Sequence, residues 1–260
     1  MNDTLIQQLG DELHQALVNR KPVSPLTTRH PDISIDDAYR IQQHMVGRRL
    51  AGGDRIVGKK IGVTSKPVMQ MLGVHQPDFG YLLSSMIADQ VTAVDFDSLI
   101  APKAEGEIAF VLKRDLRGPN VTNADVLAAT EGVMACFEIV DSRVENWKIK
   151  IQDTVADNAS CGVFVLGSQL IDPRKIDLNL CGMVLEQNGE LVATGAGAAA
   201  LGSPVNAVAW LANALGRYDI PLLAGDVILS GSLAAMIPVK RGDRFRMQIG
   251  GIGDCSVRFE

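Results

Sequence analysis

The sequence predicts an α+β fold, a mixed and largely antiparallel β-roll or sandwich with flanking helices. Three observations lead to this prediction. Helical periodicity is concentrated in the first 50 residues, extended segments separated by short turns dominate from residue 56 onward, and few helices connect those segments. No internal repeat, low-complexity stretch or linker divides the chain. We therefore expect a single domain over residues 1–260, with a helical N-terminal flank (1–50) and a β-rich core (56–260).

The N-terminal flank has the pattern of two amphipathic helices. Leucines recur every four residues from Leu5 to Leu17, and Thr4 is the candidate N-cap. A segment rich in proline and threonine, residues 21–31, is expected to form a loop. The sequence Ser34-Ile-Asp-Asp37 has the form of a capping box and should begin the second helix.

The remainder of the chain alternates between extended segments and turns. Short helices should begin at Ser65 and at Thr122, and a longer one at Ser203-Pro204. Residues 75–80 are expected to form a proline-containing turn, and the clearest hairpin is centred on Asn188-Gly189. The predicted strands are 56–63, 107–113, 133–140, 183–187, 190–194, 226–230, 235–239, 244–249 and 255–259.

Composition and charge narrow the class of protein. The chain is 47% hydrophobic and 21% charged, as in an ordinary globular protein, and its net charge of -5 gives no footprint for nucleic acid. No apolar run predicts a membrane span, and the N-terminus lacks the basic start of a secretory signal. The four cysteines form no CxxC pair, which argues against zinc or a redox motif and suits buried thiols. We expect a cytoplasmic protein with neither a nucleic-acid nor a membrane partner.

Three glutamates carry the first chemical signal. Glu105 and Glu107 lie two residues apart in an expected strand, so both side chains project from one face. Glu138 lies in a second strand among apolar residues. Any one of these acids could simply pair with a lysine or arginine. For three acids on two hydrophobic strands we favour a site for a hard divalent cation such as Mg²⁺ or Mn²⁺.

Other polar residues admit two interpretations each. Lys59 and Lys60 should face opposite ways in a strand, so one could hold a carboxylate or a proton among glycines, or both could be surface residues on an edge strand. Asp78 could cap a turn or perform acid–base chemistry. Ser160 closes a polar, small-residue segment (153–160) that suits ligand contacts, although turns share this composition.

Taken together, these residues resemble the hydratase/decarboxylase branch of the fumarylacetoacetate hydrolase-like superfamily. The resemblance covers essentially the whole chain and implies the fold of that superfamily, a single catalytic domain and a homo-oligomer. It also implies that Glu105, Glu107 and Glu138 bind Mg²⁺ or Mn²⁺, and that Lys60, not Lys59, lies in the active site. The motifs that carry it are GKKIGVTSK (58–66), QPDFGYLL (76–83), PKAEGEIAFVL (102–112), FEIVDSR (137–143), DTVADNASCG (153–162), GDVILSG (225–231) and the GIG segment near the end.

The activity that the resemblance implies is that of a metal-dependent hydro-lyase. It would add water to 2-hydroxypenta-2,4-dienoate, giving 4-hydroxy-2-oxopentanoate in aromatic meta-cleavage catabolism. Lys60 and Asp78 would be catalytic, and both would bind the substrate together with Ser160. Decarboxylation of 4-oxalocrotonate and hydration of the longer 2-hydroxyhexa-2,4-dienoate are the alternatives, and Asp78 within QPDFG favours hydration. A decarboxylase or aldolase of the same pathway is a candidate partner.

Overall fold

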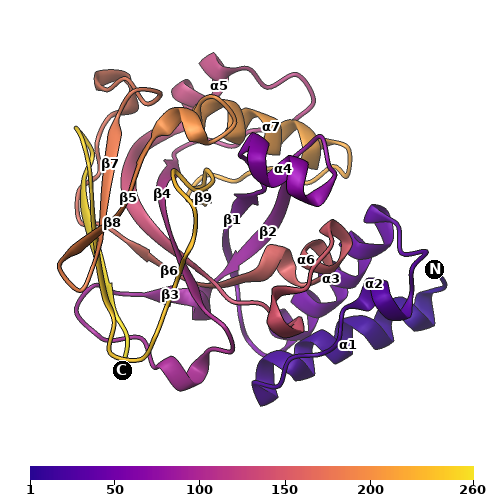
Figure 1. Cartoon of the computed structure of the whole chain (residues 1–260). Helices are drawn as coiled ribbons and strands as arrows, with labels where there is room; N and C mark the ends of the chain where they lie inside the picture. The colour runs from indigo at the N-terminus through magenta and orange to yellow at the C-terminus, as the bar shows by residue number, and fades with distance from the viewer.

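Two β-sheets form the centre of the computed structural model, which describes residues 1–260 (Figure 1). The larger sheet has eight strands: seven follow the order β2-β1-β9-β4-β5-β6-β3, and β10 pairs with β4. Its strands are β1 (Ile56–Gly62), β2 (Asp78–Leu83), β3 (Ile87–Ala88), β4 (Lys103–Leu112), β5 (Thr130–Val140), β6 (Cys161–Leu166), β9 (Val227–Leu229) and β10 (Ile237–Pro238).

The smaller sheet contains four strands in the order β12-β11-β7-β8. Only β1 with β9 and β3 with β6 pair in parallel, so the predicted mixed, largely antiparallel structure is confirmed. The strands of this sheet are β7 (Gly182–Gln187), β8 (Glu190–Ala196), β11 (Arg244–Ile249) and β12 (Gly253–Arg258).

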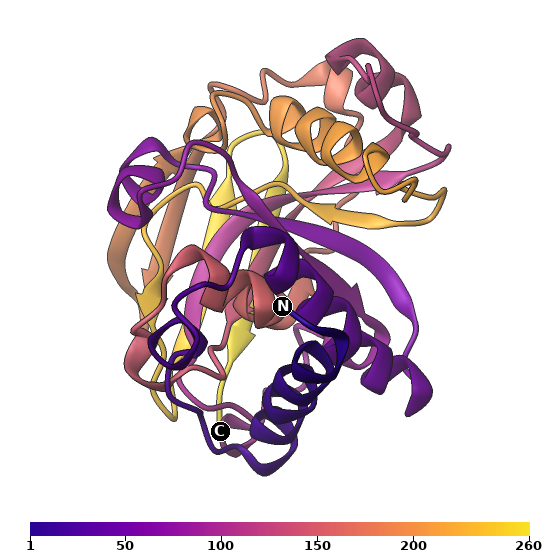
Figure 2. The same cartoon turned by 90° about the vertical axis from the view of Figure 1, so that its right-hand side faces the viewer.

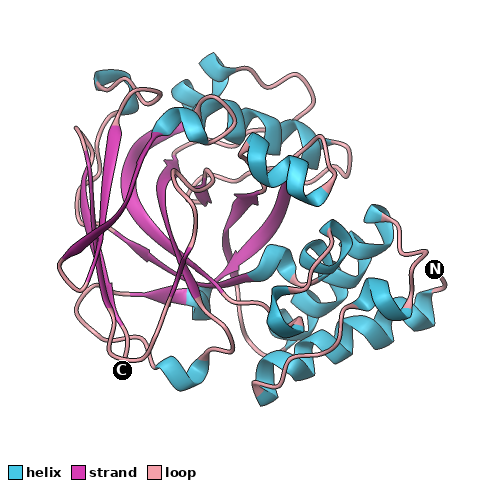
Figure 3. Ribbon diagram, viewed as in Figure 1, coloured by secondary structure: helices cyan, strands magenta, loops and turns pink.

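Helices cover two regions of the sheets, as Figure 3 shows in cyan. The first group is α1 (Asp3–Asn19), α2 (Leu26–Arg29), α3 (Ile35–Ala51) and α6 (Ile151–Ala156), which lie beside the larger sheet and face the viewer in Figure 2. The second group is α4 (Lys66–Leu72), α5 (Asn123–Ala129) and α7 (Pro204–Gly216), which lie across one end of it. A large apolar cluster of 48 buried residues fills the space among the sheets and α7, and a smaller one of 12 joins the first group.

In the N-terminal flank the structure confirms one predicted helix cap and corrects another. The predicted capping box is present, because the Ser34 side chain accepts a hydrogen bond from the Asp37 amide at the start of α3. The cap of α1 is Asn2 and not Thr4: Asn2 Oδ1 accepts from the amide of Leu5 at 2.9 Å, and the helix already includes residue 4. The predicted loop 21–31 contains the single helical turn α2.

Two predictions in the β-rich part differ from the structure. Residues 75–80 do not form a turn throughout, because β2 begins at Asp78 and all six of its residues are buried. A strand that is buried on both faces lacks the alternation by which strands are recognised. β1 is not an edge strand, since it lies between β2 and β9.

The Asn188-Gly189 hairpin is confirmed, with φ of 56° and 87° as a primed turn requires.

The segment Gly197–Gly216 is the one helical stretch whose length and mean hydropathy, 1.2, would suit a membrane span. Its regular helix, α7, covers 13 residues, about 20 Å, against a hydrocarbon core of about 30 Å. More than half of the segment is buried, and α7 packs into the larger apolar cluster. These features are those of a core helix.

Asp153 attaches the N-terminal helices to the rest of the protein. This fully buried carboxylate accepts hydrogen bonds from the Thr27 amide at 2.9 Å and the Thr27 hydroxyl at 2.7 Å. It also accepts one from the Lys150 amide at 2.9 Å, at the start of α6. One side chain therefore satisfies donors from α2 and α6 at once.

We predict that Asp153→Ala lowers the free energy of unfolding by about 2–5 kcal/mol, because each buried donor left without an acceptor costs about 1–3 kcal/mol. Urea unfolding followed by circular dichroism would measure the loss. Thr122→Ala is the matched control: it removes an exposed cap from α5 and should cost only about 1 kcal/mol. Equal losses in the two variants would contradict the role assigned to Asp153.

Candidate active site

The three glutamates converge because of the register between β4 and β5. Glu105 lies directly opposite Glu138 in this antiparallel pair, and Glu107 follows two residues later on the same face of β4. One carboxylate oxygen from each residue lies within 4.8 Å of the other two. Glu107 and Glu138 are buried, whereas Glu105 is partly exposed.

Burial gives this cluster an unusual electrostatic state. Burial, together with the neighbouring charge of Glu138, raises the pKa of Glu105 to about 7. The pKa of Glu107 lies well above its usual range for the same two reasons. The only hydrogen bond to Glu107 comes from the Gly231 amide, 2.7 Å from Oε2. Neither oxygen of Glu138 has a hydrogen-bond partner. Three crowded carboxylates, one of them with both oxygens unsatisfied, form a donor set that fits a hard divalent cation.

The two neighbouring lysines of β1 point in opposite directions, and both are 3% exposed. Lys59 pairs with Asp226 at 3.0 Å. Lys60 places Nζ 3.1 Å from Oε1 of Glu138, close enough for an ion pair but without the alignment of a hydrogen bond. Burial alone would lower the pKa of Lys60, but the charges of Glu138 and Asp78 outweigh it and raise that pKa. The surface-lysine interpretation is wrong for both residues.

Asp78 is a buried carboxylate without a hydrogen-bond partner. It is the first residue of β2, opposite Gly62 of β1, and neither of its oxygens receives a hydrogen bond. Burial raises the pKa of Asp78 to about 6, against the lowering effect of Lys60. A side chain at position 62 would not fit, because a Cβ there would lie 2.2 Å from Oδ1 of Asp78. The glycine therefore makes room for the acid.

These side chains share one cavity of about 620 Å³. Lys60, Asp78, Glu105, Glu107 and Ser160 all line it, whereas Glu138 is fully buried beside Lys60. Much of the wall is apolar, which suits a small ligand with a short hydrocarbon part. The apolar wall includes Pro67, Val68, Met71, Leu72, Ile149 and Met236.

Ser160 stands on an unusual backbone. Asn158, Ala159 and Ser160 have φ values of 53°, 51° and 53°, the left-handed region that costs of order 1–3 kcal/mol for each residue other than glycine. The segment is held in place by Asn158, which exchanges hydrogen bonds with the backbone N–H and C=O of Tyr81 in β2, at 2.8 and 2.9 Å. Sequence reasoning placed Ser160 in a polar loop and missed this conformation.

Three further residues near the site were also missed. Thr154 lines the cavity, and its hydroxyl lies 3.2 Å from that of Ser160. At the cavity wall, Lys103 Nζ lies 4.2 Å from the centre of the Trp147 ring. Thr154 and Lys103 lie within the family motifs at 153–162 and 102–112, but the sequence does not single either of them out, and Trp147 belongs to no motif.

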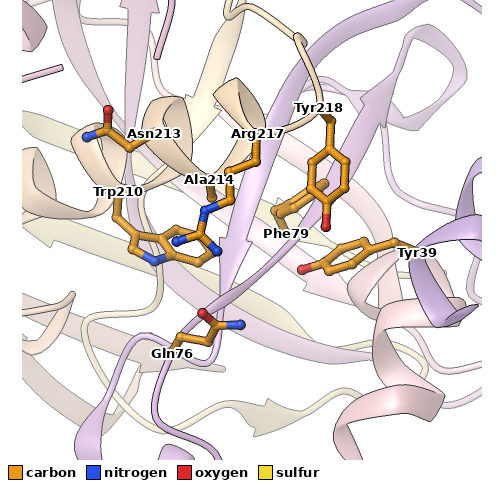
Figure 4. Close-up of a pocket in the computed structure, with 8 residues that line it drawn as sticks. All are labelled: Tyr39, Gln76, Phe79, Trp210, Asn213, Ala214, Arg217 and Tyr218. Atoms are coloured by element: carbon orange, nitrogen blue, oxygen red, sulfur yellow. The ribbon is translucent and has the colours of Figure 1, made fainter. Parts of the chain in front are cut away.

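A second, smaller recess of about 80 Å³ lies on the other side of β2 (Figure 4). Half of its eight lining residues are aromatic, among them Tyr39 and Phe79, which stack with centroids 4.4 Å apart. Phe79 faces this recess, whereas Asp78 before it faces the larger cavity. The recess contains no carboxylate and no buried lysine. The larger cavity is therefore the candidate active site.

Comparison with known proteins agrees with this fold. The family described as fumarylacetoacetate (FAA) hydrolase, C-terminal, matches residues 65–260. A 2-hydroxypent-2,4-dienoate hydratase of Pseudomonas putida is 66% identical over 221 residues, which cover 85% of this chain and 100% of that protein. A 2-hydroxyhexa-2,4-dienoate hydratase of Comamonas testosteroni is 57% identical over 98% of this chain and 97% of its own.

A solved structure matches the fold over the full length of this chain. It is 4-oxalocrotonate decarboxylase from Pseudomonas putida G7, in complex with magnesium and adipate. It superimposes with a TM-score of 0.97 at 37% sequence identity, covering 100% of this chain and 99% of its own.

The pKa values predict a pH-dependent response to metal. Because the pKa values of Glu105 and Asp78 are raised on folding, to about 7 and about 6, the folded metal-free protein binds more protons than the unfolded chain. Its stability should fall as the pH rises through this range. A bound cation needs deprotonated ligands, so the gain in Tm from saturating Mg²⁺ should be small near about pH 5 and large near about pH 8.

Thermal unfolding with Mg²⁺ or EDTA across this pH range would measure the effect. Glu12→Gln changes a partly exposed acid of α1 that does not line the cavity, and it should leave the response intact. A gain in Tm that is the same at all pH values would count against a metal held by these carboxylates.

Proposed function

The chain belongs to the fumarylacetoacetate hydrolase family, and within it we propose a metal-dependent hydro-lyase that adds water to 2-hydroxypenta-2,4-dienoate. The product would be 4-hydroxy-2-oxopentanoate, in the meta-cleavage catabolism of aromatic compounds. The observation that carries the proposal is Asp78, a buried carboxylate in the cavity with both oxygens unpartnered. Relatives at 66% and 57% identity that are named as hydratases support it.

Glu105, Glu107 and Glu138 are the proposed ligands of the cation. Bound Mg²⁺ or Mn²⁺ would supply a Lewis acid for the carboxylate and 2-oxygen of the substrate, favouring the enolate form. Support comes from the spacing of the three carboxylates and from the magnesium in the decarboxylase complex. Lys60, beside Glu138, would add a fixed positive charge where the negative charge of the enolate develops.

The reaction requires two proton transfers remote from the metal. First the dienol becomes a ketone: its O–H proton is lost and C5 gains a proton, which gives a conjugated 2-oxo-3-enoate. Water then adds, with its oxygen bonding to C4 and a proton reaching C3. Asp78 is suited to both steps, since a carboxyl with a pKa of about 6 can both donate and accept a proton near neutral pH.

Decarboxylation of 4-oxalocrotonate is the alternative reaction, since a decarboxylase shares the fold at a TM-score of 0.97. That reaction needs the same electron sink but no group that activates water. Its substrate also carries a second carboxylate, which ionised Asp78 would repel inside a largely apolar cavity. The hexadienoate substrate is a closer competitor, because one methyl group changes binding by only about 1–3 kcal/mol.

We further propose that the enzyme is a homo-oligomer that works in the cytoplasm, with a decarboxylase or aldolase of the same pathway as a candidate partner. All four cysteines are free and buried, which suits a reducing compartment.

An ultraviolet assay would test the proposed function. The purified protein should bleach the absorbance of 2-hydroxypenta-2,4-dienoate, EDTA should stop the reaction, and Mg²⁺ or Mn²⁺ should restore it. Parallel reactions with the hexadienoate and with 4-oxalocrotonate would rank the substrates. Release of CO₂ from 4-oxalocrotonate, without any turnover of a dienoate, would instead establish the decarboxylase.

Asp78→Asn should lower kcat for dienoate hydration by about 10²–10⁴-fold, the usual contribution of a positioned acid–base group. KM and the gain in Tm on adding Mg²⁺ should change little, because Asp78 is not a proposed ligand. Near-normal kcat in this variant would remove Asp78 from the mechanism.

Glu107→Gln should abolish metal-dependent turnover, since it replaces an anionic ligand by a neutral amide. The variant should still fold, because removing one of three repelling charges relieves the metal-free cluster. Circular dichroism would verify the fold, and thermal unfolding with Mg²⁺ should show a reduced gain in Tm. Full activity would refute the metal site as drawn.

A further inference from the structure

A buried ion pair behind the cavity wall has no part in the chemistry described above. Arg143 is 1% exposed, and its Nε donates to Oδ1 of Asp157 at 2.5 Å while its amide donates to Oδ2 at 3.0 Å. The rest of its guanidinium donates to the carbonyl oxygens of Asp141, Asp157 and Cys161. Arg143 does not line the cavity, so it is not placed to bind a substrate directly.

Asp157 connects this pair to Ser160. The Ser160 hydroxyl lies 3.2 Å from Oδ2 of Asp157, which is 0% exposed. Burial raises the pKa of Asp157 to about 6 and Arg143 opposes the rise, so the carboxylate is ionised in neutral and basic solution. An ionised carboxylate only accepts hydrogen bonds, and Ser160 has a single proton to donate. That proton is therefore directed at Asp157 and away from the cavity.

The direction of one hydrogen bond fixes the next. Thr154 Oγ1 lies 3.2 Å from Ser160 Oγ, and since the Ser160 proton is used, Thr154 must be the donor between them. Ser160 then presents only a lone pair to the cavity. A lone pair repels a substrate carboxylate but accepts a hydrogen bond from water.

The same segment is fixed relative to the strand that begins with Asp78. Asn158 binds both backbone groups of Tyr81 in β2, and a Cβ at Gly80 would lie 2.4 Å from the Asn158 carbonyl oxygen. These contacts therefore hold Ser160 and Asp78 in fixed positions relative to each other. Ser160 lies two residues after Asn158, and Asp78 lies three residues before Tyr81. Both line the same cavity.

We propose that Arg143 and Asp157 are positioning residues that orient Ser160 as the hydrogen-bond acceptor for the water that adds to C4. The inference rests on the proposed hydration. One proton of the water is held by Ser160 and stays on the oxygen. The other passes to Asp78 as the oxygen bonds to C4, and Asp78 returns a proton to C3 when the enolate collapses. No oxidant or further reactant is needed.

Only the second half of the reaction, hydration, uses water as a nucleophile. Loss of the oriented Ser160 should therefore slow hydration more than ketonisation. Asp157→Asn offers Ser160 an amide in place of a carboxylate, and the Asn N–H₂ can donate, which reverses the chain. Hydration should fall about ten- to hundredfold, as expected for a misplaced reactant. Ketonisation of the dienoate should fall much less, and KM should stay within about twofold of the wild-type value.

Both rates can be measured on one preparation. Loss of dienoate absorbance reports ketonisation, and hydration of 2-oxopent-3-enoate, supplied directly and followed by chromatography, reports the second step alone. Ser160→Ala and Thr154→Val should shift the ratio of the two rates in the same direction. Arg143→Lys should retain more hydration than Arg143→Gln, because it keeps the charge beside Asp157. If Asp157→Asn does not fold, the variants at Ser160, Thr154 and Arg143 still test the inference.

Asp226→Asn is the matched control. It breaks the buried Lys59–Asp226 pair, which lies at 3.0 Å and does not line the cavity. This variant should lower Tm but leave the ratio of hydration to ketonisation unchanged.

Two results would overturn the inference: wild-type hydration by Ser160→Ala, or an equal loss of both rates in Asp157→Asn, which would make the Arg143–Asp157 pair merely structural. A wild-type protein that consumes no dienoate would instead overturn the proposed function, and this inference with it.

Discussion

The pairing of Glu105 with Glu138 across two buried strands is the constraint on which the rest of the cavity depends. An antiparallel register places these carboxylates side by side, and Glu107 joins them from the same face of β4. Such a group is costly in a poorly solvated site, because each charge raises the pKa of the next. The neighbouring Lys60 and the Gly231 amide offset only part of this repulsion. A divalent cation is the compensation that three oxygen ligands fit best.

Glycines in the surrounding backbone make room for the polar groups of the cavity. Gly231 has a φ of 107° and its amide reaches Glu107, and a Cβ at this position would lie 2.4 Å from the Thr64 hydroxyl. Gly62 leaves space for Asp78 on the adjacent strand. Each glycine lets a polar group approach where a side chain would block it. Ser160 stands in a left-handed backbone conformation, and such strained conformations persist only where the surrounding structure fixes them.

The sequence could predict what depends on periodicity and local turns. The common face of Glu105 and Glu107 follows from a period of two, and the hairpin at Asn188-Gly189 follows from its turn chemistry. The start of β2 at Asp78 could not be predicted this way, because a strand buried on both faces has no alternation. Nor could periodicity choose Lys60 over Lys59, since both are buried and only tertiary contacts give one Asp226 and the other Glu138. The family motifs made that choice.

The chemistry of the cavity divides into a part that many reactions share and a part that selects one. A decarboxylase has nearly the same fold, at a TM-score of 0.97, and its complex contains magnesium. Stabilising an enolate therefore cannot distinguish loss of CO₂ from addition of water, because both reactions need that stabilisation. Addition of water requires two further things: a group that exchanges protons with carbon, and an acceptor that orients water. Asp78 and Ser160 stand on two segments joined through Asn158 and Tyr81. In the mechanism we propose, selectivity for hydration thus resides in this linked pair and not in the glutamates.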